Sequence, residues 1–233
     1  MKNILLGGVA ALTLGGCMSA DRMIDGVSST IDQSRDAMGP QGAPVAQADA
    51  VAVPDNVLLA DWTCPYDGVP PWDKVRPELF DQAIQFGVDE QAREYRAITD
   101  NPEAPSFANT IEAGERAGQR LNRVMAVFGV MTDNMSTPAY EAIEKAWSPK
   151  LSAAFDAITL DPTLFQRVEN LYNNRDQLGL DAKQMRVLTK TYDAMVHSGA
   201  KLDPAGKAQL TQINQDLSSS FSAFNSKLLA DEG

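Results

Sequence analysis

Histidine is almost absent from this sequence of 233 residues, and its scarcity limits the chemistry that the chain can perform. His197 is the only one. A zinc site of the His-Glu-x-x-His type needs two imidazoles, so this chain cannot build one. The two cysteines, Cys17 and Cys64, are too few for a four-thiolate metal site. The sequence therefore supplies no metal-ligand set, and we identify no catalytic or cofactor-binding residue in it.

Basic residues are fewer than acidic residues, which argues against nucleic acid as a partner. There are 20 lysines and arginines against 31 aspartates and glutamates, a formal net charge of -11. Binding to nucleic acid depends on neutralising phosphates with basic side chains, so we expect no nucleic-acid partner. Aromatic residues make up 7% and apolar residues 44%, which is typical of an ordinary globular protein.

The longest N-terminal apolar run is too short to span a bilayer as a mature helix. Lys2 precedes the run Ile4–Leu14, an arrangement typical of a signal peptide. The run ends in Leu14-Gly15-Gly16-Cys17, which resembles the cleavage box of bacterial lipoproteins. We predict that residues 1–16 are a lipoprotein signal peptide and that Cys17 is the lipidated residue. The alternative is a plain secretory peptide with an incidental cysteine.

An acylated Cys17 would place the protein at the periplasmic face of the cell envelope. Three acyl chains anchor a protein stably, whereas one binds only marginally. Anionic lipid repels an acidic chain, so the anchor rather than surface charge would hold it at the membrane. The residue after Cys17, at the second mature position, is Met18 rather than aspartate, which resembles the sorting signal for the outer membrane.

Residues 17–56 are expected to form the lipidated cysteine and a flexible tether. Proline, glycine and small side chains dominate this stretch, and few large apolar groups offset the entropy of ordering it. Beyond it, Cys64 has no intrachain partner once Cys17 is acylated. We interpret Cys64 as a buried free thiol beside Trp62, with an intermolecular disulfide or a reactive thiol as the alternative.

Helix start signals recur along the rest of the chain. Pro77 suits a first helical turn, and capping residues stand directly before proline at Thr137, Asp161 and Asp203. Two further starts have the spacing of a capping box, Asn109-x-x-Glu112 and Asp181-x-x-Gln184. No convincing period-2 strand appears, so the predicted fold class is all-α, a multi-helix array.

Charged residues at 89–94 are predicted to form a solvated helix face with local pairing, Asp89 with Arg93, rather than paired catalytic carboxylates. Gly114 and Gly118 mark a place where another helix could approach closely. His197 is expected to be a cation-capable side chain near a helix C-terminus.

Three methionines, Met125, Met131 and Met135, are interpreted as core residues rather than a soft-metal site, because no histidine or cysteine joins them. The last predicted helix carries a long apolar stripe that suggests a surface for another lobe. The stripe consists of Leu210, Ile213, Leu217, Phe221, Phe224 and Leu228.

Six stretches of the sequence, taken in their order and spacing, resemble the N-terminal part of the thimet oligopeptidase family of zinc peptidases. Within that family the resemblance is strongest to the bacterial peptidyl-dipeptidases (dipeptidyl carboxypeptidases) and weaker to oligopeptidase A. They are Leu59-Ala60-Asp61-Trp62; Tyr66-x-Gly68-Val69-Pro70-Pro71-Trp72-Asp73-Lys74-Val75 with Pro77-Glu78-x-Phe80; Asn101-Pro102-Glu103-Ala104-Pro105-Ser106-Phe107-x-Asn109-Thr110-Ile111-Glu112-Ala113; Leu121-Asn122-Arg123-Val124; Leu178-Gly179-Leu180-Asp181-Ala182; and Ile213-Asn214-Gln215-x-Leu217-Ser218. The resemblance covers about residues 57–233.

This resemblance implies the helical N-terminal lobe, over 57–233, of a longer two-lobed enzyme. Family members enclose a deep channel that admits only short peptides, and zinc is held by a His-Glu-x-x-His helix and a downstream glutamate. That helix lies beyond the matched segment, so no catalytic residue carries over. The implied partners are a missing C-terminal catalytic lobe and, in the full-length protein, short peptide substrates and zinc.

Two other interpretations remain. One is a stand-alone envelope lipoprotein that serves as a binding or scaffold module without catalysis. The other is a metal-independent enzyme, which the sequence does not favour because no nucleophile–base pair is visible.

Overall fold

The computed structural model describes residues 51–63 and 68–231, and within them every regular element is a helix. The predicted all-α fold class is confirmed. The signal peptide, Cys17, most of the tether and Cys64 lie outside the described residues. The described helices include none that is both long and apolar enough to cross a membrane.

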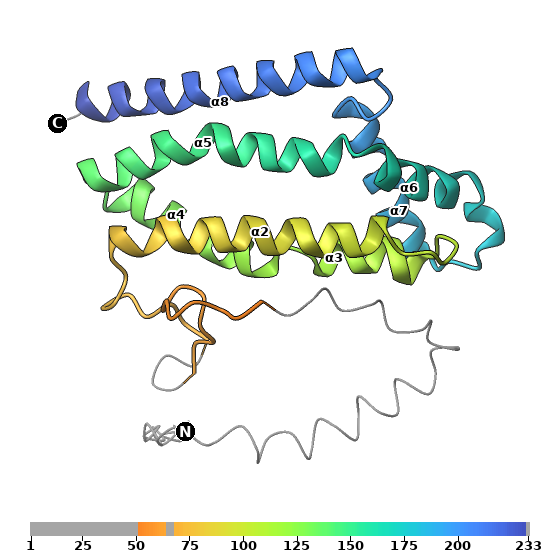
Figure 1. The fold of residues 1–233 in the computed structure, drawn as a ribbon, viewed down its shortest axis with the longest axis horizontal. Helices are drawn as coiled ribbons and strands as arrows, with labels where there is room; N and C mark the ends of the chain where they lie inside the picture. The colour runs from red at the N-terminus through yellow and green to blue at the C-terminus, as the bar shows by residue number, and fades with distance from the viewer. Residues whose placement is uncertain (1–50, 64–67, 232–233) are drawn as a thin grey trace, which may run out of the picture.

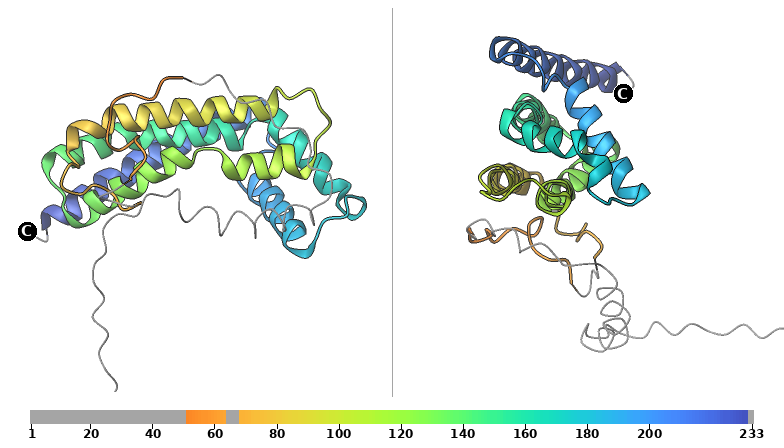
Figure 2. Two further views of the ribbon diagram at one scale, coloured as in Figure 1. Left: turned by 90° about the horizontal axis from the view of Figure 1, so that it is seen from below. Right: turned by 90° about the vertical axis from the view of Figure 1, so that its right-hand side faces the viewer.

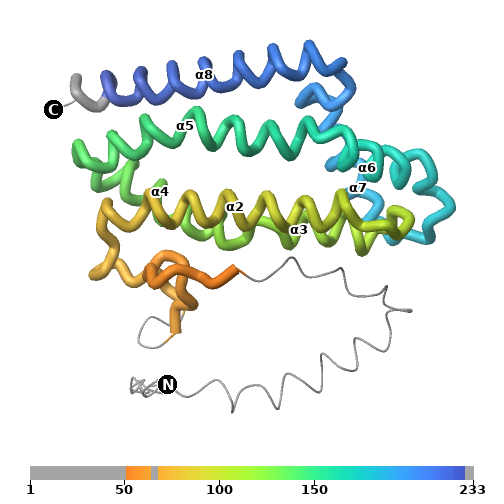
Figure 3. The backbone as a smooth tube through the Cα atoms, in the orientation of Figure 1, coloured from red at the N-terminus to blue at the C-terminus, as the bar shows by residue number. Residues whose placement is uncertain are grey.

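The helices are stacked in layers. The long helix α2 (Phe80–Thr99) packs against both α4 (Gln119–Asn134) and α5 (Pro138–Thr159), which also contact each other. The last helix, α8 (Pro204–Asp231), lies along the outer side of α5 (Figure 1). Figure 2 shows the same order from the end of the molecule. The shorter helices α6 (Pro162–Asn173) and α7 (Ala182–His197) gather at the end opposite residue 231 (Figure 3).

Most predicted helix starts are confirmed by their caps. The Asp161 carboxylate accepts the Leu164 amide at 2.7 Å, and the Asp203 carboxylate accepts the Gly206 amide at 2.7 Å. Asp181 and Gln184 form the complete reciprocal capping box that was predicted at the start of α7. These caps satisfy amides that the first helical turn leaves without partners. At α5 the helix begins at Pro138 as predicted, although the Thr137 side chain makes no capping bond.

The prediction that Asn109 is the capping residue of a helix was wrong. Ser106 is the cap, and Asn109 occupies the third helical position of its capping box. A π-helical segment, η2 (Phe107–Glu112), continues into the short α3 (Ala113–Arg116), and the chain then breaks at Gly118. Gly118 has φ +73°, a left-handed conformation that glycine adopts without the steric cost of a Cβ. Two short segments and α4 therefore replace the expected helix.

The larger of two hydrophobic cores lies where α2, α4 and α5 meet the segment before α2. The rings of Phe80, Phe128 and Tyr140 form its centre, with centroids 5.0 to 6.4 Å apart. The smaller core joins α6, α7 and η2 around Leu171 and Leu188, which are fully buried. A short 3-10 turn, η1 (Pro77–Leu79), leads into α2, and another, η3 (Arg175–Gln177), follows α6.

A buried arginine connects the smaller core to the loop after α2. The Arg167 guanidinium, on α6, donates to the carbonyl oxygens of Asn101 and Glu103 at 3.1 and 3.2 Å, to Asn109 Oδ1 at 3.0 Å and to Thr110 Oγ1 at 3.3 Å. The residue is 7% exposed. Burial lowers the pKa of the guanidinium, which nearby Glu103 opposes. Arg167 thus fixes the 101–110 segment against α6.

We predict that Arg167→Met lowers the free energy of unfolding by about 2–4 kcal/mol, because it leaves several buried acceptors without a donor. Urea denaturation measures the change. Arg186→Met on the exposed side of α7 is the matched control and should change stability by less than about 0.5 kcal/mol. Equal effects of the two substitutions would contradict the role given to Arg167.

Candidate functional site

The only histidine lies alone. His197 ends α7, is exposed, and its Nδ1 lies 2.6 Å from the Asp193 carbonyl oxygen. This is the predicted position near a helix C-terminus. Across residues 51–63 and 68–231, no three His, Cys, Asp or Glu side chains are grouped so that they could hold a metal ion. The described residues therefore do not fit a zinc ion.

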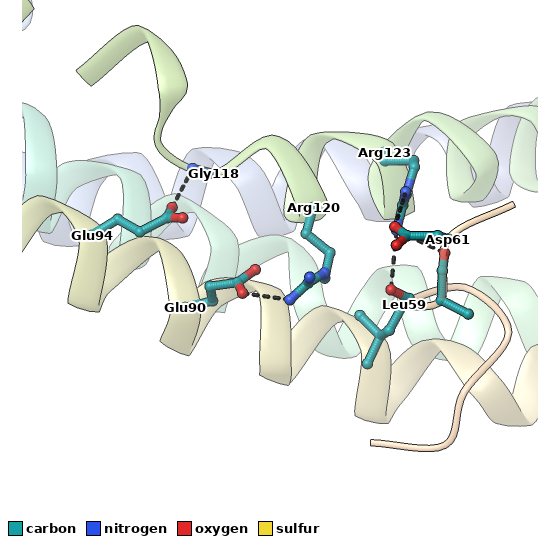
Figure 4. A network of polar contacts seen from close by, with 8 residues as sticks. Leu59, Asp61, Glu90, Glu94, Gly118, Arg120 and Arg123 are labelled. Carbon is teal, nitrogen blue, oxygen red and sulfur yellow. Dashed lines mark hydrogen bonds and ion pairs between the residues drawn. The ribbon is translucent and has the colours of Figure 1, made fainter. Parts of the chain in front are cut away.

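The acidic residues of α2 do not form the solvated, locally paired face that was predicted. Glu90 pairs across to Arg120 on α4, and Glu94 Oε2 accepts the Gly118 amide at 2.6 Å (Figure 4). Asp89 accepts a bond from Gln85 on its own helix. The prediction was wrong for Glu90 and Glu94 because their partners, on α4 and at its N-cap, are 30 and 24 residues away in sequence.

Burial has a larger effect on the pKa of the Glu90 carboxyl than the ion pair with Arg120 has. Desolvation raises the pKa of the Glu90 carboxyl, and the Arg120 guanidinium offsets this only in part. Arg120 also lies 5.6 Å above the Phe86 ring, so its guanidinium is held on two sides. Glu94, in turn, places a carboxylate at the N-terminus of α4, where the helix dipole favours negative charge. Both acids join helices and present no free carboxylate pair.

Gly118 is required where α2 approaches the break before α4. A Cβ built on Gly118 would lie 2.2 Å from Gln91 Nε2, and Gln91 is buried. The expectation of a close helix approach at Gly118 is confirmed, with a broken rather than a continuous helix as its setting. Gly114 makes a looser approach, since a Cβ there would lie 3.8 Å from the Tyr95 ring.

Two of the stretches quoted for the family resemblance meet at Arg123. Its Nη2 donates to the carbonyl oxygens of Leu59 and Ala60, both at 3.0 Å, and its Nη1 lies 3.9 Å from Asp61 (Figure 4). The guanidinium also stacks 4.8 Å from the Trp62 ring. Arg123 therefore holds the segment before α2 onto α4. Sequence reasoning missed this contact, because its members are about 60 residues apart.

Two of the three methionines predicted to be core residues lie in or against the larger core. Met131 is 8% exposed and Met125 packs against the larger core, as predicted. Met135 is 62% exposed, so the core prediction was wrong there. It follows the last residue of α4, where the helix has already left the core.

Two small cavities lie near Tyr95, and neither has the makeup of a catalytic site. One, of about 270 Å³, lies between α2, α5 and α6; the other, of about 280 Å³, lies between η2, α3, α6 and α7. Tyr95, Ile158 and Leu164 line both. Burial, with Glu115 and Glu94 nearby, raises the pKa of the Tyr95 hydroxyl, which makes it a poor base at neutral pH. No nucleophile with an adjacent base lines either cavity.

The sequence of this chain is similar to those of known peptidases. The chain is 34% identical over 175 residues to the dipeptidyl carboxypeptidases of Salmonella typhimurium and Escherichia coli. The match covers 75% of this chain and 26% of each relative. No protein-family model matches the chain. The chain thus spans about a quarter of the length of the curated relatives it matches, and its similarity to them supports kinship with the peptidyl-dipeptidases.

Proposed function

We propose that this chain is the non-catalytic helical N-terminal lobe of a zinc peptidase of the peptidyl-dipeptidase type. The observation that carries the proposal is the 34% identity over 175 residues to dipeptidyl carboxypeptidases. The complete protein would release dipeptides from the C-terminus of short peptides. Zinc, bound by a His-Glu-x-x-His helix outside this chain, would activate the attacking water.

The proposed role of the lobe is to form one wall of the substrate channel. Its support lies in what the shared stretches do in this structure. Arg123, in the stretch 121–124, binds the stretch 59–62, and Arg167 holds the stretch 101–113 against α6. These contacts pack helices and leave no reactive pair. A rigid wall restricts which peptides enter, and the reaction itself belongs to the other lobe.

The lobe would be held at the periplasmic face of the outer membrane by a lipid on Cys17. Support comes from the order of the apolar run, the glycine pair and the cysteine. Residues 1–16 would be removed, and residues 17–56 would separate the anchor from the helices.

Acylation predicts that the N-terminal peptide of the membrane-extracted protein begins at Cys17 and carries the mass of three acyl chains. Mass spectrometry of that peptide checks this. Cys17→Ala should release the protein from the membrane fraction, whereas Ser19→Ala should stay membrane-bound. An unmodified Cys17 in the mature protein would contradict the anchor.

The proposed non-catalytic role of this chain can be assayed directly. The purified 233-residue chain, supplied with zinc and a short peptide with a free C-terminus, should release no dipeptide and should retain far less than one zinc ion per chain after gel filtration. The Escherichia coli dipeptidyl carboxypeptidase is the positive control. Stoichiometric zinc with chelator-sensitive dipeptide release would contradict the proposal.

The nucleotide sequence of the gene distinguishes the lobe of a longer protein from a stand-alone module. An open reading frame that continues past the Gly233 codon to a His-Glu-x-x-His sequence supports the lobe. A natural stop directly after that codon, in several independent isolates, would favour the stand-alone module instead.

A further inference from the structure

The last helix, α8, carries a row of exposed apolar side chains. Five of them expose 47% to 61% of their surface, and we name them the α8 row. Single exposed apolar residues are common on proteins, but a row of them along one helix marks an interaction site. The α8 row consists of Ile213, Leu217, Phe221, Phe224 and Leu228.

The α8 row lies on the flank of α8, beside the face that packs on α5. The packed face is polar, because Asn214 donates to both carboxylate oxygens of Asp156 at 3.0 Å, and Ser222 is 4% exposed. Each residue of a helix turns by about 100° around its axis, so the row is centred about a quarter turn from Asn214 and Ser222. These polar contacts fix the rotation of α8 and leave the row exposed at the edge of the packing between the two helices.

A groove of about 400 Å³ between α5 and α8 adjoins the row. Leu217 and Phe221 of the row line it on α8, and Ser148 and Ser152 line it on α5. The distance at which helices pack depends on the size of the side chains between them. The short serine side chains therefore let a further helix approach both α5 and α8.

Glu144 adds a polar requirement to this surface. It is the one charged residue among the described residues that line the groove. Burial, with Asp133 and Glu141 nearby, raises the pKa of the Glu144 carboxyl. Covering a carboxyl group is costly unless it gains a hydrogen bond. An occupant thus needs apolar side chains towards the row and a hydrogen-bond donor towards Glu144, which an amphipathic helix supplies on adjacent faces.

The spacing of the row also suits a helix. Leu217, Phe221, Phe224 and Leu228 follow one another at steps of four, three and four residues. This is the heptad pattern by which one helix packs along another. From Ile213 to Leu228 the row is about 22 Å long, so a helix of about four turns covers it.

The rest of a longer protein is well placed to supply that helix. Among the described elements α8 is outermost, and none of them lies over its outer side (Figures 1 and 2). The match covers 26% of each relative, so about three quarters of the length of each relative lies outside it. If the chain is the N-terminal lobe proposed above, the following segment leaves from the end of α8, close to Leu228. Consecutive helices are usually neighbours in space, so this segment starts beside the row.

We propose that the α8 row and the adjoining groove bind an amphipathic helix from the part of the peptidase that follows residue 233. This proposal rests on the function proposed above, and it names the surface through which the lobe joins the rest of the enzyme. The apolar side of the incoming helix covers Leu217, Phe221 and Phe224, and a donor at its edge bonds to Glu144.

Cysteine labelling tests the proposal. Leu217→Cys, Phe221→Cys and Phe224→Cys are made one at a time, both in the 233-residue chain and in a hybrid. In the hybrid, residues 57–233 replace the matched segment of the Escherichia coli dipeptidyl carboxypeptidase. Mass spectrometry follows the reaction of each introduced thiol with a maleimide at about 1 µM protein. Labelling in the hybrid should be at least about 20-fold slower than in the 233-residue chain, because the thiol is then buried.

The matched control is Ala223→Cys, an exposed position of α8 outside the row. Its thiol should react at rates within about twofold of each other in the two proteins. Circular dichroism and thermal melting establish that each variant is folded, and sedimentation establishes whether the hybrid is a monomer.

Dipeptide release by the hybrid tests the proposed function separately. A folded hybrid whose row thiols react as fast as those of the 233-residue chain overturns the docking surface, whether or not it releases dipeptides. A hybrid that does not fold, beside a folded Escherichia coli enzyme, overturns it as well, because the row then does not fit the rest of the enzyme. Protection that accompanies dimerisation and is lost on dilution assigns the row to a second copy and also overturns it. A monomeric hybrid that protects the row yet releases no dipeptide supports the docking surface and contradicts the proposed function alone.

Discussion

The close approach of α2 and α4 is the constraint on which the rest of the fold depends. At Gly87 a Cβ would lie 3.0 Å from the Leu121 Cα, so any larger residue there would push the two backbones apart. The approach buries Phe80 and Ile84 completely and brings Glu94 within reach of the Gly118 amide. Because α5 packs on both α2 and α4, and α8 packs on α5, each outer layer rests on this pair.

Two arginines hold stretches that were quoted for the family resemblance. Arg123 and Arg167 each bind backbone carbonyls of a distant segment, at Leu59 and at Asn101. A guanidinium reaches several carbonyl oxygens at once in a fixed geometry, which lysine cannot reproduce. In this structure the two guanidinium groups therefore hold the segment before α2 and the loop after α2 against helices.

Local signals in the sequence predicted the helices well, but they did not predict the contacts between distant segments. The caps at Asp161, Asp181 and Asp203 depend on neighbours within three residues, so their pattern is readable in one dimension. Glu94 was misread because its partner, the Gly118 amide, becomes available only where the chain breaks before α4. The apolar row of α8 from Ile213 to Leu228 has the pattern of a core helix, yet its side chains are about half exposed, because polar contacts such as Asn214 with Asp156 hold another face of α8 on α5. That the chain lacks a pair of histidine ligands for zinc, by contrast, can be read from the sequence, which contains one histidine.

The central claim is that these residues supply structure to a peptidase whose chemistry lies elsewhere. The most direct test exchanges the matched 175-residue segment of the Escherichia coli dipeptidyl carboxypeptidase for the corresponding segment of this chain, and measures dipeptide release from a short peptide. We predict that the folded hybrid releases dipeptides and that Arg167→Met within it lowers its thermal stability. A hybrid that is folded by circular dichroism and thermal melting, yet releases no dipeptide, would contradict the claim.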